Sequence, residues 1–398
     1  MMKKCVSIFF VSLLAVLFSH AQQTPILIDE GRSYEVDAIL TSKGDLIAVW
    51  MGDRPDVVNQ GRGIKDVAVY YATSTDTGKT WVKKSIIDFP NSMITANPKL
   101  AMDDNGEVYL TLMSVDHTFF SSRLELFKYD VVRKKFSHIS QPFSSTSALL
   151  DKPSLVVRDG IFELTYVIYT SGMSEGRVLH QQSVDGGKSW SSAIDISPKS
   201  NILFLGASTK ISKDNLLFSV GSFHQDSVYF AIQKAGRLFQ NKDLSFHGIS
   251  EISSELGAAM TELETGNKDD MVISIQKNHQ LGGLYVLCSN DAGTTWTSPV
   301  CIADTGFLLS TAIGSNSVLH TSYFIKDNVG IKFIYEQYNI SELCKPKSER
   351  KIKVSQSVGY TDYIGAFQKI LIHGDSKQIL LFWIDYGNGN ILKMSKIP

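Results

Sequence analysis

Outside its N-terminus, this sequence of 398 residues contains no long apolar run, no basic tract and no convincing helical periodicity. The first absence excludes transmembrane helices from the rest of the chain. Its 39 basic and 40 acidic residues are nearly balanced, and no cluster of lysines and arginines remains to bind nucleic acid. The absence of helical periodicity leaves β-strands as the expected source of the core.

Cysteine is also scarce, with four residues, and their spacings do not suggest a zinc site. Cys288 and Cys301 are expected on neighbouring strands. A cross-strand disulfide between them would suit an exported protein, and two buried thiols suit the sequence at least as well. Asp-rich turns could offer oxygen ligands to Ca²⁺, but no metal motif is present. The sequence therefore predicts no cofactor and no metal site.

Residues 1–21 have the pattern of a cleavable signal peptide. Lys3 and Lys4 are followed by an apolar stretch over residues 6–18, and Ala21 supplies a small residue at the expected cleavage site. We therefore expect residues 22–398 to form a single mature domain, periplasmic or secreted. Loss of the two lysines changes the formal net charge from −1 to about −3.

One eight-residue motif, S-x-D-x-G-x-[ST]-W, occurs three times, beginning at Ser74, Ser183 and Ser289. An Asp followed two residues later by Gly is typical of a turn, because the carboxylate caps backbone N–H groups and Gly accepts a positive φ. The runs before each copy are rich in β-branched and aromatic residues, so each copy is expected to join two strands. The motif residues expected to be structural are Asp76, Trp81, Asp185, Trp190, Asp291 and Trp296.

The three copies resemble the Asp-box of the sialidase-like (BNR repeat) β-propellers. This resemblance implies an all-β propeller of four-stranded antiparallel blades, with the box on the rim away from the active face. The copies are 109 and 106 residues apart, and one blade takes about 40–50 residues. Each interval therefore predicts two blades, and the chain predicts seven. Six blades, as in sialidases proper, is the alternative.

Matching the strand patterns gives seven expected starts of inner strands. They fall near Tyr34, Asn97, Asp151, Leu205, Gly257, Ser310 and Tyr360. The last blade has only three expected strands, the final one ending at residue 397. Residues 25–28 are expected to supply its fourth, outer strand, which closes the ring and removes the open edges.

In a propeller, the start of each inner strand and the turn after the second strand converge on one face. The polar residues at these places form the expected carbohydrate-binding face. The candidate catalytic residues are Tyr360, Asp53, Asp56, Asp37, Glu35, His117 and His224. The candidate substrate-binding residues are Arg54, Asp116, Asp151, Lys152, Glu255, Lys277, His279, Asp362 and Asp385.

The resemblance to sialidases does not extend to their substrate clamp. Those enzymes bind the substrate carboxylate with three arginines and use a tyrosine nucleophile paired with a glutamate. Tyr360 matches the tyrosine, but Glu35 stands in the stretch that should carry the first arginine, and Lys277 in that of the second. Lysine cannot reproduce the bidentate pairing of arginine with a carboxylate, and an acid would repel it. We therefore expect that the protein is not a sialidase.

Three functions remain open from the sequence. Carboxylates beside Tyr360 could provide the acid and base of a glycoside hydrolase acting on a poly- or oligosaccharide, which is the favoured interpretation. His117 or His224 with Tyr360 could instead abstract a proton beside a uronate, as in a polysaccharide lyase. A propeller that binds a glycan or a protein without catalysis is the third. Fold analogy alone cannot choose among them.

Overall fold

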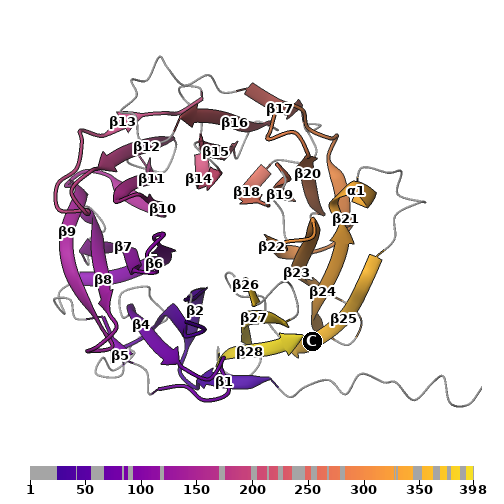
Figure 1. The fold of residues 1–398 in the computed structure, drawn as a ribbon, viewed down its shortest axis with the longest axis horizontal. Helices are drawn as coiled ribbons and strands as arrows, with labels where there is room; N and C mark the ends of the chain where they lie inside the picture. Colours follow the sequence, from indigo (N-terminus) through magenta and orange to yellow (C-terminus); the bar gives the residue numbers. More distant parts are fainter. Residues whose placement is uncertain are drawn as a thin grey trace, which may run out of the picture.

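The computed structural model forms a ring of seven sheets, each with four antiparallel strands (Figure 1). It describes residues 25–41, 43–54, 67–82, 85–87, 93–116, 121–169, 175–198, 204–212, 215–222, 227–234, 247–251, 258–266, 269–277, 283–326, 328, 330–343, 352–361, 368–373, 378–385 and 391–397. The expected seven-bladed β-propeller is therefore confirmed, and the alternative of six blades is wrong. The expected signal peptide lies outside the described residues.

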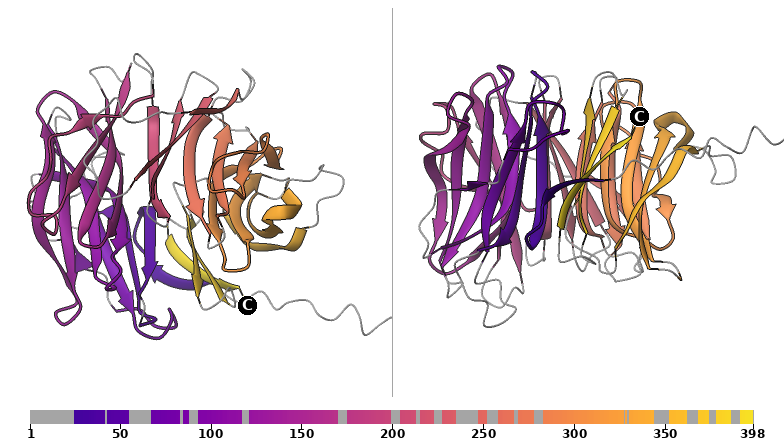
Figure 2. Two further views of the ribbon diagram at one scale, coloured as in Figure 1. Left: turned by 45° about the horizontal axis from the view of Figure 1, so that its top comes forward. Right: turned by 90° about the horizontal axis from the view of Figure 1, so that it is seen from below.

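Each blade contributes one strand to each of four concentric layers (Figure 1), and the strands run roughly along the axis of the ring (Figure 2). The inner strands are β2 (Ser33–Leu40), β6 (Met93–Met102), β10 (Leu149–Arg158), β14 (Phe204–Ser212), β18 (Ala258–Thr265), β22 (Phe307–Ile313) and β26 (Lys369–His373). The second strands are β3 (Leu46–Asp53), β7 (Val108–Asp116), β11 (Ile161–Tyr169), β15 (Asn215–Ser222), β19 (Met271–Lys277), β23 (Val318–Lys326) and β27 (Gln378–Asp385).

The third strands are β4 (Val67–Ser74), β8 (Ser122–Asp130), β12 (Gly176–Ser183), β16 (Ser227–Lys234), β20 (Leu284–Ser289), β24 (Ile331–Asn339) and β28 (Ile391–Ile397). The outer strands are β5 (Ser85–Ile86), β9 (Lys135–Ser145), β13 (Ile194–Asp195), β17 (His247–Glu251), β21 (Val300–Ala303), β25 (Ile352–Thr361) and β1 (Ile26–Asp29). A short helix, α1 (Ile340–Leu343), follows β24. Among the described residues, no helix is long and apolar enough to cross a membrane.

The ring closes as the sequence predicts. The N-terminal strand β1 pairs with the C-terminal strand β28 and becomes the outer strand of the seventh blade (Figure 1). Because the first and last strands share one sheet, the blade that joins the chain ends is complete, and no half-blade leaves an unpaired edge at the closure.

The start expected for the seventh inner strand is wrong. Tyr360 lies in β25, the outer strand of the sixth blade, where it pairs with Lys332 of β24. The seventh inner strand, β26, begins at Lys369. The starts of β22 and β26 are 62 residues apart, against 49 for β18 and β22. The sixth blade is longer because α1 and a connecting segment lie between its third and fourth strands, so a constant spacing places the next blade too early.

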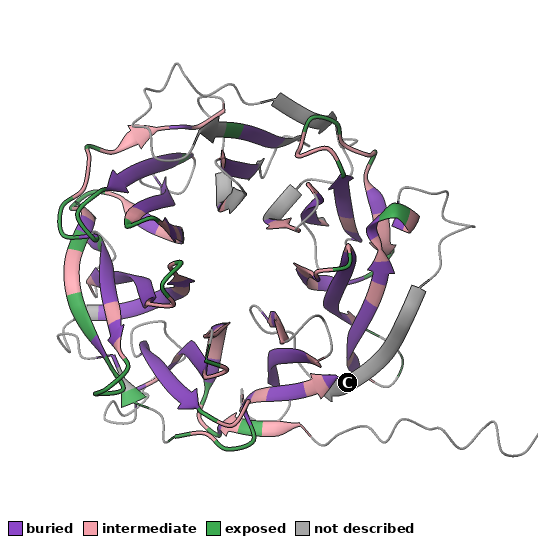
Figure 3. Ribbon diagram, in the orientation of Figure 1, coloured by how far each residue is buried: buried purple, intermediate pink, exposed green. Residues whose placement is uncertain are grey.

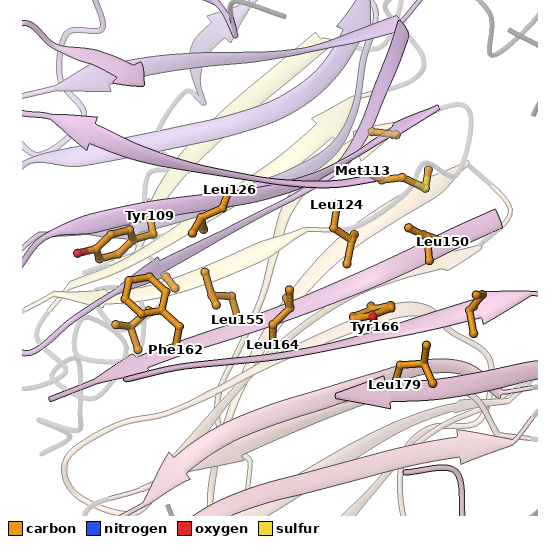
Figure 4. Close-up of a cluster of buried hydrophobic side chains, with 14 of the residues drawn as sticks. Tyr109, Met113, Leu124, Leu126, Leu150, Leu155, Phe162, Leu164, Tyr166 and Leu179 are labelled. Carbon is orange, nitrogen blue, oxygen red and sulfur yellow. The ribbon is translucent and has the colours of Figure 1, made fainter. Parts of the chain in front are cut away.

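The core consists of apolar layers between neighbouring blades (Figure 3). In β3, Leu46, Ala48 and Trp50 pack towards the seventh blade, while Ile47 and Val49 pack towards the second. A strand buried on both faces needs apolar residues at successive positions, which explains the unbroken apolar runs in the second strands. Figure 4 shows the layer between the second and third blades, with Tyr109 and Leu126 facing Phe162 and Leu164.

All three motif copies join the third and fourth strands of alternate blades, the first, third and fifth. In the second copy, the Ser183 hydroxyl bonds Asp185 Oδ1 at 2.9 Å and accepts the Gly187 N–H at 3.0 Å. The Ser189 hydroxyl bonds Asp185 Oδ2 at 2.5 Å. The other two copies repeat these bonds. The double-blade spacing inferred from the sequence is therefore correct.

The motif turns lie at the end of the ring opposite the starts of the inner strands. Ser74, at the end of β4, pairs with Leu46, which in turn pairs with Leu40 at the end of β2. Hydrogen bonds from Thr295 and Ser289 hold the pKa of Asp291 down at about 2. The hydrogen bonds of this carboxylate therefore stabilise its own turn. The turn lies far from the strand ends where the candidate site residues were expected.

Two adjacent glycines of the second motif copy provide a matched test of the turn. Gly186 and Gly187 have φ values of 77° and 82°, so alanine at either position meets the left-handed backbone penalty, roughly 1–2 kcal/mol. A Cβ at Gly186 would meet open space, whereas one at Gly187 would lie 2.4 Å from Leu126 Cδ2.

We expect Gly187→Ala to lower the free energy of unfolding by about 1–3 kcal/mol more than Gly186→Ala, because only Gly187→Ala also overpacks the core. Urea denaturation of both variants measures the difference. Equal losses would contradict the packing of this turn against the second blade.

The two cysteines that the structure describes are both thiols. Cys288 lies buried in β20 and Cys301 lies partly exposed in β21. In the register of these strands, Cys301 pairs with Tyr285 and not with Cys288. Of the two interpretations left open by the sequence, the structure therefore favours thiols.

Candidate active site

Six inner strands carry a β-bulge near their start, where the strand has one residue more than its partner. The register shifts occur in β2, β6, β10, β14, β18 and β22. At four of these bulges a residue other than glycine has a positive φ: 39° at Glu35, 50° at Asn97, 49° at Lys152 and 54° at Leu308. Such strained backbone is a typical feature of functional sites.

Three of these residues come from consecutive blades and lie close together. Lys152 Nζ lies 3.5 Å from Glu35 Oε1 and 3.3 Å from Asn97 Oδ1. Since β2, β6 and β10 are the inner strands of neighbouring blades (Figure 1), the lysine crosses the second blade to reach the first. The bulges therefore gather Glu35, Asn97, Asp151 and Lys152 into one polar cluster, which we call the three-blade cluster.

Asp151 is the second carboxyl of this cluster. Its Oδ1 accepts the Lys152 backbone N–H at 2.9 Å and the Asn97 side-chain N–H at 2.5 Å. Burial raises the pKa of Asp151, and the nearby charge of Glu35 raises it further, against the opposing effects of Lys152 and the two hydrogen bonds. The net direction is upward, so Asp151 holds a proton more readily than an ordinary aspartate does.

Lys152 is the cation between two carboxyls. Burial lowers its pKa, but the charges of Glu35 and Asp151 outweigh burial, and the net pKa is raised. The ammonium therefore stays charged. Its bond to Asn97 Oδ1 turns the amide so that Nδ2 faces Asp151. The cluster thus holds two carboxyls in unlike surroundings, which is the arrangement expected for an acid and its partner carboxylate.

Asp37 lies deeper in β2 and connects three blades. Its Oδ1 is 3.3 Å from Lys369 Nζ of the seventh blade, and its Oδ2 accepts the Leu100 N–H of the second blade at 2.9 Å. Burial raises its pKa, but the charges of Lys369 and Lys99 outweigh burial, and the net pKa is lowered. Both oxygens of this predicted catalytic residue are therefore engaged in inter-blade contacts.

The other described candidates lie at the same end of the ring, outside the three-blade cluster. Asp53 ends β3, where it accepts the Tyr34 hydroxyl at 3.3 Å and pairs with Arg32 at 3.7 Å. Asp385 ends β27 and pairs with Lys393 at 2.6 Å. Arg54 is buried directly after β3, and Asp116 ends β7.

Several candidates cannot be assigned to the cluster. Asp56, His117, His224, Glu255, His279 and Asp362 lie outside the described residues. Tyr360 and Lys277 lie in β25 and β19, and the structure describes their backbone without their side chains. Their proposed roles remain predictions.

Two residues of the site, Asn97 and Tyr169, were not among the candidate catalytic or substrate-binding residues. Asn97 has a signal in the sequence, since Asn97-Pro98 and Lys152-Pro153 occupy the same bulge position in successive blades. Burial raises the pKa of Tyr169, and the nearby charge of Asp151 raises it further. Tyr169 ends the apolar run of β11, a position typical of a core residue. No sequence pattern distinguishes it from Tyr166, a core residue of the same strand.

No group of three or more His, Cys, Asp or Glu side chains in the described part of the chain could hold a metal ion. The three-blade cluster contains the Lys152 ammonium, 3.5 Å from Glu35 Oε1.

Comparison with solved structures finds the same fold in glycan-acting enzymes. An α-L-arabinanase from Penicillium chrysogenum, complexed with arabinobiose, matches with a TM-score of 0.58 at 12% identity, covering 94% of this chain and 97% of the other. An α-L-arabinofuranosidase from Fusarium graminearum matches with 0.54 at 13% identity, covering 94% and 97%. The intramolecular trans-sialidase from Ruminococcus gnavus matches with 0.52 at 14%, covering 92% and 94%. No protein-family model and no curated protein matches the sequence.

Proposed function

We propose that this seven-bladed β-propeller, whose fold is similar to that of arabinan-acting enzymes and sialidases, is a glycoside hydrolase whose catalytic carboxyls are Asp151 and Glu35. The observation that carries this proposal is the three-blade cluster, in which bulges bring two carboxyls from different blades to one lysine. Glycoside hydrolysis generally requires two carboxyls in unlike environments, one to donate a proton and one to remain charged. The arabinan-acting and sialic-acid-acting structural neighbours support a sugar ligand.

Asp151 is the proposed general acid. Because Oδ1 already accepts two N–H donors, its proton resides on Oδ2. In the reaction this proton passes to the glycosidic oxygen as its bond to the anomeric carbon breaks. Water then adds to that carbon and releases a proton, and Asp151 is protonated again for the next turnover. Burial raises the pKa of Asp151, which favours the protonated form that a general acid needs.

Glu35 is the proposed partner carboxylate. The Lys152 ammonium lies 3.5 Å from its Oε1, and its side chain retains 20% exposure, so it is accessible. A carboxylate here stabilises the positive charge that develops at the anomeric carbon when the leaving group departs. Lys152 and Asn97 hold the two carboxyls in place and can also bond to sugar hydroxyls.

We further propose that the substrate is a neutral sugar and not a sialic acid. Lys152, Lys369 and Lys393 at this end of the ring each lie beside a carboxylate of the protein. Glu35 occupies the stretch where the resemblance to sialidases requires an arginine. An incoming carboxylate would therefore meet negative charge in a partly desolvated site, where repulsion is strong.

A panel of substrates tests this function. Aryl glycosides of neutral pentoses and hexoses, arabinan and other neutral polysaccharides, and sialyl-lactose are incubated with the purified protein. We expect release of aryl alcohol or reducing ends from a neutral substrate and no release of sialic acid. An unsaturated product absorbing in the near ultraviolet would instead support a lyase. Glycan binding without turnover would support a non-catalytic propeller.

The N-terminal pattern supports the proposal that the protein is exported. Cleavage after Ala21 would leave Gln22 as the first residue of the mature chain. Mass spectrometry of the protein recovered from the periplasm or culture medium measures this end. Recovery of the full-length chain from the cytoplasm alone would contradict export.

A further inference from the structure

Exposed apolar side chains gather at one end of the ring. Among the described residues, six large apolar side chains are exposed, and four of them are valines in the turns that follow the third strands of the first three blades. They are Val82, Val131, Val132 and Val184, and Val132 is the most exposed, at 93%. We call these four residues the apolar rim. They lie at the end of the ring that carries the motif turns, opposite the three-blade cluster.

The three turns of the apolar rim are neighbours. The Tyr71 hydroxyl of the first blade donates to the Lys134 carbonyl oxygen, in the turn of the second blade, at 3.2 Å. The Ser140 hydroxyl of the second blade donates to the Gly187 carbonyl oxygen, in the turn of the third blade, at 2.5 Å. Exposed apolar side chains on adjoining surface elements mark an interaction site, whereas single ones are ordinary. The apolar rim is therefore a candidate contact surface that extends over three blades.

The hairpin turn between β8 and β9 projects the two central valines of the rim into solvent. Asp130 Oδ1 accepts the Val132 N–H at 2.9 Å and the Arg133 N–H at 3.0 Å, and Lys134 has a positive φ of 50°. These features fix the turn without the valine side chains. Turns favour Gly, Asn, Asp, Pro and Ser, so two adjacent branched apolar residues here contribute exposed apolar area that the turn itself does not need.

Cations accompany the apolar rim. The same three turns contain five exposed basic residues against three aspartates, and each aspartate accepts N–H groups of its own turn. The basic residues are Lys79, Arg133, Lys134, Lys135 and Lys188, and the aspartates are Asp76, Asp130 and Asp185. Two further exposed acids of this end, Asp104 and Asp159, lie in turns that follow inner strands, nearer the axis of the ring. The outer edge beside the valines is therefore cationic.

We propose that the apolar rim and its five cations bind the surface of an anionic lipid bilayer. A bilayer requires no complementary groove, because projecting apolar side chains enter the boundary between headgroups and acyl chains while Lys and Arg pair with lipid phosphates. The longest run of cations has three members, too few for a nucleic-acid-binding tract. Attachment by this end turns the three-blade cluster away from the membrane, since the strands run along the axis of the ring (Figure 2). This surface acts independently of the proposed hydrolase activity.

Cosedimentation with lipid vesicles tests the proposal. The chain from residue 22 is used, because the apolar stretch over residues 6–18 would itself bind lipid. Vesicles of equal parts phosphatidylglycerol and phosphatidylcholine are compared with vesicles of phosphatidylcholine alone. We expect the affinity for the anionic vesicles to be at least about tenfold higher, and to fall as the salt concentration rises.

Two variants separate the contributions of charge and apolar contact. Arg133→Gln/Lys134→Gln/Lys135→Gln should lower the affinity for anionic vesicles by about 100-fold, at roughly fivefold for each charge. Val131→Ser/Val132→Ser keeps all five cations and should lower it by about tenfold, because less apolar area enters the bilayer. Both variants change exposed side chains, so their urea midpoints should stay near that of the wild type.

Leu27→Ser is the matched control. Leu27 lies in β1, the outer strand of the seventh blade, and is 44% exposed, but it stands outside the three turns. Replacing it removes a comparable exposed apolar side chain and should leave vesicle binding at the wild-type level.

Three results would overturn the proposal. The first is no binding to anionic vesicles, or equal losses in Leu27→Ser and Val131→Ser/Val132→Ser. The second is binding to dextran sulfate as tight as to anionic vesicles, with neither affected by Val131→Ser/Val132→Ser, since the cations would then bind any polyanion without insertion. The third is a dimer that Val131→Ser/Val132→Ser abolishes, in a protein that binds no vesicles, which would assign the apolar rim to a second copy of this chain.

Discussion

Replacing Asp151 with asparagine is expected to lower kcat/KM by about 10²–10⁴-fold on a substrate whose leaving group needs protonation. Asparagine keeps the size and can still accept the Lys152 and Asn97 donors at its carbonyl oxygen, but it has no proton to give. The loss should therefore arise in kcat and leave the fold intact.

The leaving group provides the control for this variant. An activated aryl glycoside, such as a dinitrophenyl derivative, departs without a proton from the enzyme, so Asp151→Asn should hydrolyse it at a rate near that of the wild type. An alkyl glycoside of the same sugar should be almost inert. Parallel losses on both substrates would show that Asp151 does not act as the acid.

Replacing Glu163 with alanine is expected to produce the largest loss of stability, about 3–5 kcal/mol. Glu163 Oε2 lies 2.9 Å from His180 Nε2, and both side chains are only 2% exposed. Its Oε1 accepts the Gln182 side-chain N–H at 2.9 Å. The variant leaves the buried side chains of His180 and Gln182 without this acceptor, and buried polar groups that lose a partner are costly.

Glu125→Ala is the matched comparison. Glu125 forms the same bond to His138 at 2.9 Å, but His138 is 45% exposed, so its ring can hydrogen-bond to water instead. We expect this variant to lose about 1–3 kcal/mol, less than Glu163→Ala. Denaturant unfolding of both variants measures the difference. A smaller loss in Glu163→Ala than in Glu125→Ala would contradict the burial of the Glu163–His180 pair.

Much of the fold could be predicted because its signals are local. The S-x-D-x-G-x-[ST]-W turn depends on bonds within eight residues, so its three copies mark three blades and their spacing reveals the others. The closing strand β1 was predictable because the last blade lacked a strand. Tyr360 was placed wrongly because α1 lengthens the sixth blade, and the local strand pattern does not register such an insertion.

The site was harder to predict because it depends on contacts between blades. Glu35, Asp151 and Lys152 were all candidates, but the sequence gives no reason to prefer them to Asp37 or Asp53. The choice depends on bulges that turn three side chains towards one another across two blade boundaries. Asp37 looked equally suitable, and only its contacts with Lys369 and Leu100 indicate that it joins blades.

The measurement that tests the three-blade cluster most directly compares two carboxyls of the first blade. Glu35→Gln and Asp53→Asn make the same change, one inside the cluster and one at the end of β3. On the best neutral glycoside, with both variants shown to be folded, we expect kcat/KM to fall by about 10²–10⁴-fold in Glu35→Gln and by less than about tenfold in Asp53→Asn. A large loss in Asp53→Asn with near wild-type activity in Glu35→Gln would contradict the assignment of the active site to the three-blade cluster.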